Sequence, residues 1–177
     1  VGSQREALAA TLDALARFDH WMCRARLAEE MDAVRPEPSR DGEVVLLSAR
    51  HPGLSGTVVP IDVRLGGEYT ALVVTGPNTG GKTVALKTVG LLCLMARSGL
   101  PIPAGEGTTV PFFDSIFAEI GDDQSLGSGL STFSAQIAGI AKMTIGEGTQ
   151  ALVLLDELGS GTDPLEGGAL GAAIIDD

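Results

Sequence analysis

The feature that most limits what this chain can fold into is the octet Gly-Pro-Asn-Thr-Gly-Gly-Lys-Thr at residues 76–83, which directly follows the apolar run 71–74. It fits the phosphate-loop template GxxxxGK(S/T). A strand that ends at a glycine-rich turn and continues as a helix directs backbone N–H groups and the positive helix end toward one point, where polyphosphate can sit. The pattern therefore predicts strand, loop and helix in that order, within an α/β fold of the P-loop NTPase type.

The octet supplies most of the predicted nucleotide site. Lys82 is expected to reach the β- and γ-phosphates of ATP, and the Thr83 hydroxyl is expected to hold Mg²⁺. The loop residues predicted to bind ATP or ADP are Gly76, Pro77, Asn78, Thr79, Gly80, Gly81, Lys82 and Thr83.

A second element ends in an acidic pair. Residues 151–155 are all apolar and predict a strand buried on both faces, as in a parallel sheet covered by helices. Ligands bind at the carboxyl ends of such strands, so Asp156 is the predicted Mg²⁺ partner and Glu157 the residue that orients or deprotonates the attacking water. The alternative is a strand that merely reaches solvent at two carboxylates. The phosphate loop in the same chain favours the first interpretation.

The N-terminal segment predicts one long helix over residues 4–32. Its apolar residues recur at spacings of three and four, typical of a coiled-coil stripe, and they are Leu8, Leu12, Leu15, Phe18, Met22 and Ala25. The helix either packs on a core or is a lever from an upstream domain, and a length on the order of 40 Å favours the lever. Because prolines and a glycine mark a linker over 35–42, residues 1–36 are predicted to be the lever helix and 37–177 the P-loop ATPase domain.

The remaining elements predict a mixed sheet flanked by helices. Strands are expected over 43–48, 57–63, 69–75 and 115–120, and helices over 82–98, 132–143 and 165–175. Cys23 and Cys93 fall in helical patterns and are expected to be reduced thiols in the core.

The charge balance excludes one class of binding surface. The net charge is −11, with only 12 Lys and Arg in 177 residues, which argues against a surface for nucleic-acid phosphates on this polypeptide. No signal peptide and no apolar run long enough for a bilayer is visible, so a cytoplasmic protein without membrane contact is expected.

The glycine-rich loop at 121–133 turns into a helix at Ser131. The ordinary interpretation is an N-cap, because a serine side chain accepts a bond from the first helical N–H groups. A helix start with a hydroxyl also suits an anion, so a γ-phosphate held by a partner subunit is the alternative.

Four segments, in order along the chain, resemble the ATPase domain of the MutS family. They are residues 75–90, 117–125, 130–134 and 155–164, and the similarity continues upstream through 50–52 and 25–28. Thr79 and the Lys-Thr-Val order at 82–84 resemble the second bacterial type, MutS two. ABC and structural-maintenance ATPases are less similar, since they carry Leu-Ser-Gly-Gly-Gln where this chain has Leu-Ser-Thr-Phe-Ser at 130–134.

The resemblance implies an ABC-like P-loop NTPase that forms a homodimer with two ATP molecules at the interface. It implies that residues 76–83 are the Walker A loop, that Asp156 and Glu157 are the Walker B pair, and that Ser131 with Thr132 reaches the partner subunit's γ-phosphate. It also implies that Ile61 packs on the adenine and that Asp163 lies in a loop crossing the interface. His51 is expected to have a structural or base-proximal role rather than a catalytic one.

The resemblance also implies a fragment. Relatives have a further strand and a switch histidine after Walker B, a DNA clamp and a C-terminal Smr nuclease domain. The chain is therefore expected to bind ATP or ADP weakly or moderately, to hydrolyse ATP poorly alone, and to self-associate through an exposed sheet edge.

In the whole protein, ATP hydrolysis is expected to drive a dimer that acts on branched DNA, or on stalled ribosomes, through domains absent here, with the nuclease activity in the Smr domain. The alternative is a nucleotide-gated binding module in which hydrolysis is incidental.

Overall fold

The computed structural model describes residues 4–77, 80–120, 137–141, 143, 149–158 and 163–176. Its elements are α1 (Arg5–Met31), β1 (Glu37–Pro38), β2 (Val44–Ala49), β3 (Ile61–Leu65), α2 (Lys82–Arg97), β4 (Thr109–Val110), β5 (Ser115–Glu119), β6 (Ala151–Leu155) and α4 (Pro164–Asp176). The predicted mixed α/β class is confirmed. None of the helices in these ranges is both long and apolar enough to cross a membrane.

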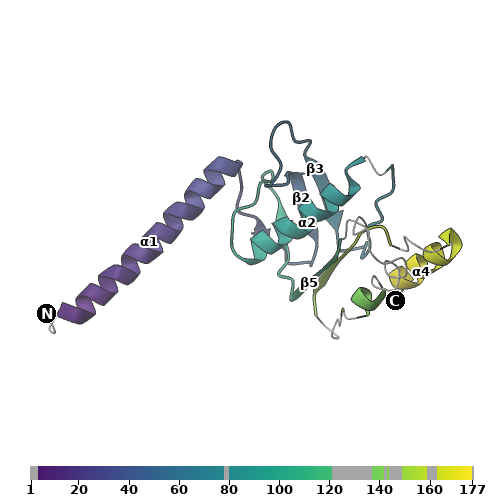
Figure 1. Cartoon of the computed structure of the whole chain (residues 1–177). Coiled ribbons are helices and arrows are strands. Elements are labelled where there is room, and N and C mark those ends of the chain that lie inside the picture. Colours follow the sequence, from purple (N-terminus) through teal and green to yellow (C-terminus); the bar gives the residue numbers. More distant parts are fainter. Residues whose placement is uncertain are drawn as a thin grey trace, which may run out of the picture.

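Helix α1 extends away from the rest of the protein (Figure 1). It runs for 27 residues and buries none of them, and its apolar stripe faces solvent, with Leu12 68% exposed and Phe18 58% exposed. The predicted helix over 4–32 is therefore confirmed. The stripe is not part of the core of this chain.

The strands form two separate sheets. One sheet has four strands in the order β1-β4-β2-β3, and the other pairs β5 with β6 in parallel. The predicted strands over 43–48, 115–120 and 151–155 are confirmed. The strand predicted over 57–63 begins only at Ile61, because Gly56 and Pro60 interrupt the segment before it.

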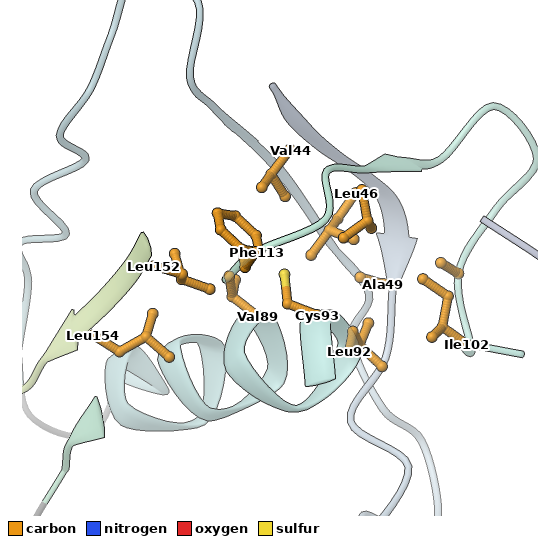
Figure 2. Packing of buried hydrophobic residues seen from close by; sticks show 12 residues of the cluster. Val44, Leu46, Ala49, Val89, Leu92, Cys93, Ile102, Phe113, Leu152 and Leu154 are labelled. Atoms are coloured by element: carbon orange, nitrogen blue, oxygen red, sulfur yellow. The ribbon is translucent and has the colours of Figure 1, made fainter. Parts of the chain in front are cut away.

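Helix α2 packs against both sheets and so forms the centre of the core (Figure 2). The side of α2 that carries Val89, Leu92 and Cys93 is buried. Figure 2 shows these side chains beside three sets of neighbours: Val44, Leu46 and Ala49 of β2, Phe113 before β5, and Leu152 and Leu154 of β6. The helix predicted over 82–98 is thus confirmed.

Two predictions about strands are wrong. Of the strand predicted over 69–75, only Tyr69 pairs, in an isolated bridge with Gly66. Residues 71–75 belong to no strand, and Leu72, Val73 and Val74 are 54%, 65% and 51% exposed. The apolar run predicted a strand, but a strand needs a neighbour for its ladder, and 71–75 pairs with no described strand of either sheet. In β6, Leu152 and Leu154 are buried while Val153 is 37% exposed, so only one face of that strand is covered.

The two helices predicted toward the C-terminus have different outcomes. The helix predicted over 165–175 is confirmed by α4. Of the helix predicted over 132–143, only 137–141 and 143 are described, and 137–140 is helical. The rest of that prediction lies outside the described residues.

The two cysteines have opposite environments. Cys93 is buried as predicted, whereas Cys23 is exposed, so the prediction of a core thiol is wrong for Cys23. Cys23 is exposed because α1, to which it belongs, buries none of its residues. Burial raises the pKa of the Cys93 thiol to about 12, since the thiolate loses its hydration there.

We expect a thiol reagent to modify one cysteine rapidly in the native chain and two in the unfolded chain. At pH 8 only about one Cys93 thiol in 10,000 is ionised, and the thiolate is the reacting form. With Ellman's reagent, Cys23 should react promptly and Cys93 at least about 100-fold more slowly. A Cys23→Ser variant should lose the fast phase alone. Two equally fast phases in the native chain would contradict the buried position of Cys93.

Candidate functional site

The centre of the predicted site is a direct contact between its two halves. The Thr83 hydroxyl donates a hydrogen bond of 2.6 Å to the Asp156 carboxylate (Oδ2), although the two residues are 73 positions apart. Thr83 lies in the first turn of α2, and Asp156 follows the last residue of β6. Two segments singled out separately from the sequence therefore meet at one point.

Close packing of α2 on β6 holds this contact in place. At Gly90 a Cβ atom would overlap the tip of the Leu154 side chain, so any larger residue there would force Leu154 to move. The Asp156 N–H donates to the carbonyl of Glu119 at 3.0 Å, which fixes the chain beyond β6 to the end of β5. The sequence alone did not predict a role for Gly90. An isolated glycine within a helical pattern was the available signal.

The described residues of the glycine-rich loop are joined by two hydrogen bonds, one of which comes from the lysine. The Lys82 ammonium donates a bond of 2.6 Å to the carbonyl of Gly76, and the Gly80 N–H donates to the carbonyl of Pro77 at 2.9 Å. Gly81, at the start of α2, has φ of 80°. No atom of a described residue lies within 4 Å of where a Cβ would stand at Gly81, so among those residues the backbone angle, and not space, favours glycine there. Asn78 and Thr79 lie outside the described residues.

The donor set of Thr83 and Asp156 fits Mg²⁺. A hydroxyl and a carboxylate are hard oxygen ligands, and Mg²⁺ in proteins is usually held by one or two carboxylates together with substrate phosphates and water. Within the described ranges no three His, Cys, Asp or Glu side chains lie close enough to form a metal cage. The pair therefore suits a metal ion that brings its other ligands with it.

Glu157 follows Asp156 directly and differs from it in exposure. Its side chain is exposed, whereas Asp156 is partly buried. Its backbone has φ of 48°, in the left-handed region that is uncommon for residues other than glycine. A carboxylate in this position can reach solvent and any water beside a ligand at Asp156.

The remaining predicted site residues are placed as follows. Ile61 is the first residue of β3 and packs partly buried against the core. His51 has a structural contact, since its Nδ1 accepts a bond of 3.1 Å from the Gly53 N–H. Asp163 acts as the N-cap of α4, because its carboxylate accepts a bond of 2.9 Å from the Leu165 N–H. Ser131 and Thr132 lie outside the described residues.

A family model and individual relatives both place this chain in the same family. Residues 72–177 match the family described as MutS domain V. The chain is 52% identical over 169 residues to "Endonuclease MutS2" of Pelotomaculum thermopropionicum, covering 96% of this chain and 22% of that protein. It is 50% identical over 178 residues to the protein of the same name from Exiguobacterium sibiricum, covering 100% and 23%. The Brevibacillus brevis protein is 52% identical over 172 residues, covering 97% and 22%. The chain therefore spans less than a quarter of the length of these relatives.

Proposed function

The chain belongs to the MutS family and has MutS2 proteins among its relatives, and from that premise we propose that it binds ATP at the Thr83–Asp156 site and hydrolyses it to ADP and phosphate. The observation that carries the proposal is the 2.6 Å contact between the Thr83 hydroxyl and the Asp156 carboxylate. It supports the proposal because a phosphate-loop threonine and a strand-end carboxylate are the two side chains that share Mg²⁺ in P-loop enzymes.

The residues of the loop bind and orient the triphosphate. The Lys82 ammonium, which now bonds to the Gly76 carbonyl, exchanges that partner for phosphate oxygens. The start of α2 adds the backbone N–H groups and the positive helix end that favour an anion. When bound, Mg²⁺ neutralises charge on the β- and γ-phosphates. The cradle proposed for the phosphates consists of the loop residues Gly76, Pro77, Asn78, Thr79, Gly80 and Gly81.

Glu157 serves as the residue that orients or deprotonates the attacking water. Its exposed side chain adjoins Asp156, so it can reach a water molecule on the solvent side of the γ-phosphate. Ile61 is proposed to contact the base. Ser131 and Thr132 are proposed to reach the γ-phosphate bound by a second copy.

For the whole protein, the proposal is an ATP-dependent homodimer that acts on branched DNA or on ribosomes. Residues 1–36 act as a lever and 37–177 as the ATPase domain. The net charge of −11 supports a division of labour, because the basic surface for nucleic acid then belongs to other segments of the protein. The relatives are named endonucleases, and nuclease activity is proposed for the whole protein rather than for residues 1–177.

Titration calorimetry with Mg²⁺ and ATP tests nucleotide binding. We expect saturable heat for ATP and ADP, and we expect Lys82→Ala to weaken ATP binding by about 10- to 100-fold, since a charged hydrogen bond is lost. Lys87→Ala is the matched control, because Lys87 is exposed on the same helix and outside the loop. Absence of heat from a chain shown to be folded by circular dichroism would refute the proposal.

A further inference from the structure

The junction between α1 and the rest of the protein is held with little apolar burial. Only the last two turns of α1 touch the body, and the half-buried residues there share one face of the helix: Arg24, Leu27, Ala28 and Met31. No residue of α1 is fully buried. Because hydrophobic stabilisation scales with the apolar area removed from water, it contributes little to fixing the direction of this helix.

Arg50 makes the polar contacts at this junction. Its Nη2 donates to the carbonyls of Met31 and Asp32 at 3.1 and 2.7 Å, and both Nη atoms lie 3.2 Å from the Asp32 carboxylate. The Asp32 side chain is 91% exposed, so the ion pair itself stabilises the junction only slightly. The hydrogen bonds from Arg50 to the two carbonyls therefore contribute most of its stabilisation of the junction.

These carbonyls are the ones that a helix leaves without internal partners at its C-terminal end. A cation near that end is stabilising, because it opposes the negative pole of the helix. Helix α1 has no basic residue in its own last turn. Arg50, supplied by the body, provides the missing cation and donors from outside the helix.

The backbone around Arg50 is itself firmly held. The Arg50 N–H donates to the carbonyl of Pro103 at 2.9 Å. Just before it, β2 contains a bulge in which Ser48 has φ of 46° and donates its N–H to the Asp62 carboxylate at 2.7 Å. The bulge bends the strand immediately before Arg50. Arg50 thus joins the end of β2 to the last turn of α1.

Directly beyond α1, backbone hydrogen bonds tie the chain to the body, while one side of the junction is open. Val34 and Ile102 exchange two backbone hydrogen bonds of 2.9 Å, and Ile102 is fully buried. Beside the last turn of α1 lies a cavity of about 420 Å³, bordered by Glu30 and Met31 on the helix and by His51 on the body, among others. Close packing therefore does not prevent α1 from tilting toward this side.

We infer that Arg50 is the positioning residue that sets the direction of α1 relative to the two sheets, through its hydrogen bonds to the carbonyls of Met31 and Asp32. The Val34–Ile102 pair acts as the pivot, and Arg50 selects one orientation about it. This inference depends only on contacts at the junction and holds whether or not the chain hydrolyses ATP.

The test is the distance between a spin label on α1 and one on the body. Cys23 is exposed on α1 and Lys87 is exposed on α2, so Cys23 together with Lys87→Cys gives the pair, while buried Cys93 stays unlabelled. Pulsed electron–electron double resonance is recorded on the 177-residue chain diluted with unlabelled chain, so that distances within one molecule dominate.

We expect one narrow distance distribution in the parent and a population of other distances increased about tenfold in Arg50→Ala. Arg50→Lys should give an intermediate result, because an ammonium keeps the charge but loses the planar fork. Arg64→Ala is the matched control, since Arg64 is an exposed arginine of β3 that pairs with Glu43. A distribution in Arg50→Ala as narrow as that of the parent would overturn the inference.

A second variant covers the case in which Arg50→Ala does not fold. Asp32 has φ of 47°, which glycine adopts freely, so Asp32→Gly removes the carboxylate contact without backbone strain. It should broaden the distribution less than Arg50→Lys, since both carbonyl contacts remain. If Arg50→Lys leaves the distribution unchanged, the inference fails regardless of the Asp32→Gly result.

Discussion

Glu157→Gln should slow ATP hydrolysis by about 100- to 10,000-fold and leave ATP binding unchanged. Glutamine keeps the size of the side chain but cannot take a proton from the attacking water. No hydrogen bond joins Glu157 to the described part of the phosphate loop, whereas Asp156 accepts one from Thr83. Phosphate release from labelled ATP, with the chain in excess over nucleotide, measures hydrolysis even where turnover is slow. Calorimetry measures binding in parallel.

Glu106→Gln is the matched control for this change, because Glu106 is an exposed glutamate in a turn before β4. It should leave both measurements unchanged. A nucleotide-gated binding module, the alternative raised by the sequence, predicts no loss of any measured function in Glu157→Gln. Hydrolysis within about tenfold of the parent would therefore remove Glu157 from the proposed mechanism.

Gly90→Val should lower the free energy of unfolding by about 3 kcal/mol. The added side chain overlaps Leu154, which is 5% exposed in the core and has little room to turn away. Leu154 lies two residues before Asp156, so a displaced β6 also carries Asp156 away from Thr83. We expect weaker binding of Mg²⁺ and ATP in the fraction that stays folded. Urea denaturation followed by circular dichroism measures the loss of stability.

Gly168→Val is the matched control for the packing argument. Gly168 also lies within a helix, but no atom from the described part of the chain is within 4 Å of where its Cβ would stand. The same substitution there should change the free energy of unfolding by no more than about 0.5 kcal/mol. Equal losses at the two glycines would mean that helix propensity, and not contact with Leu154, determines the effect at Gly90.

Two elements beside the candidate site were predicted correctly, the helix from Lys82 and the strand over 151–155, whereas the strand before the phosphate loop was not. The apolar period, the glycine that ends α2 and the prolines after it were sufficient to predict the helix from Lys82. The apolar run at 151–155 predicted β6. Because ligands bind at the carboxyl ends of such strands, Asp156 was predicted as a site residue. Their meeting at 2.6 Å follows from topology, because both lie at the same edge of an α/β arrangement.

The wrong predictions concern contacts between distant segments. Residues 71–75 have the composition of a strand, but a strand is defined by its neighbour, and composition does not say which neighbour is present. Cys23 falls in a helical pattern that gives no sign that this helix buries none of its residues fully. The sequence did not predict that Arg50 contacts Asp32 or that Gly90 packs against Leu154, since the partners lie far apart along the chain.

The contact between Thr83 and Asp156 closes a loop of 73 positions, and ordering such a loop has an entropic cost that one hydrogen bond does not offset. A ligand that binds both Thr83 and Asp156 would behave as a non-covalent cross-link that exists only in the folded chain. By mass action, each tenfold rise in such a ligand above its dissociation constant adds about 1.4 kcal/mol of protection against unfolding. If the ligand is ATP, as proposed, cellular nucleotide level and resistance to heat or proteolysis are linked through this one pair of side chains.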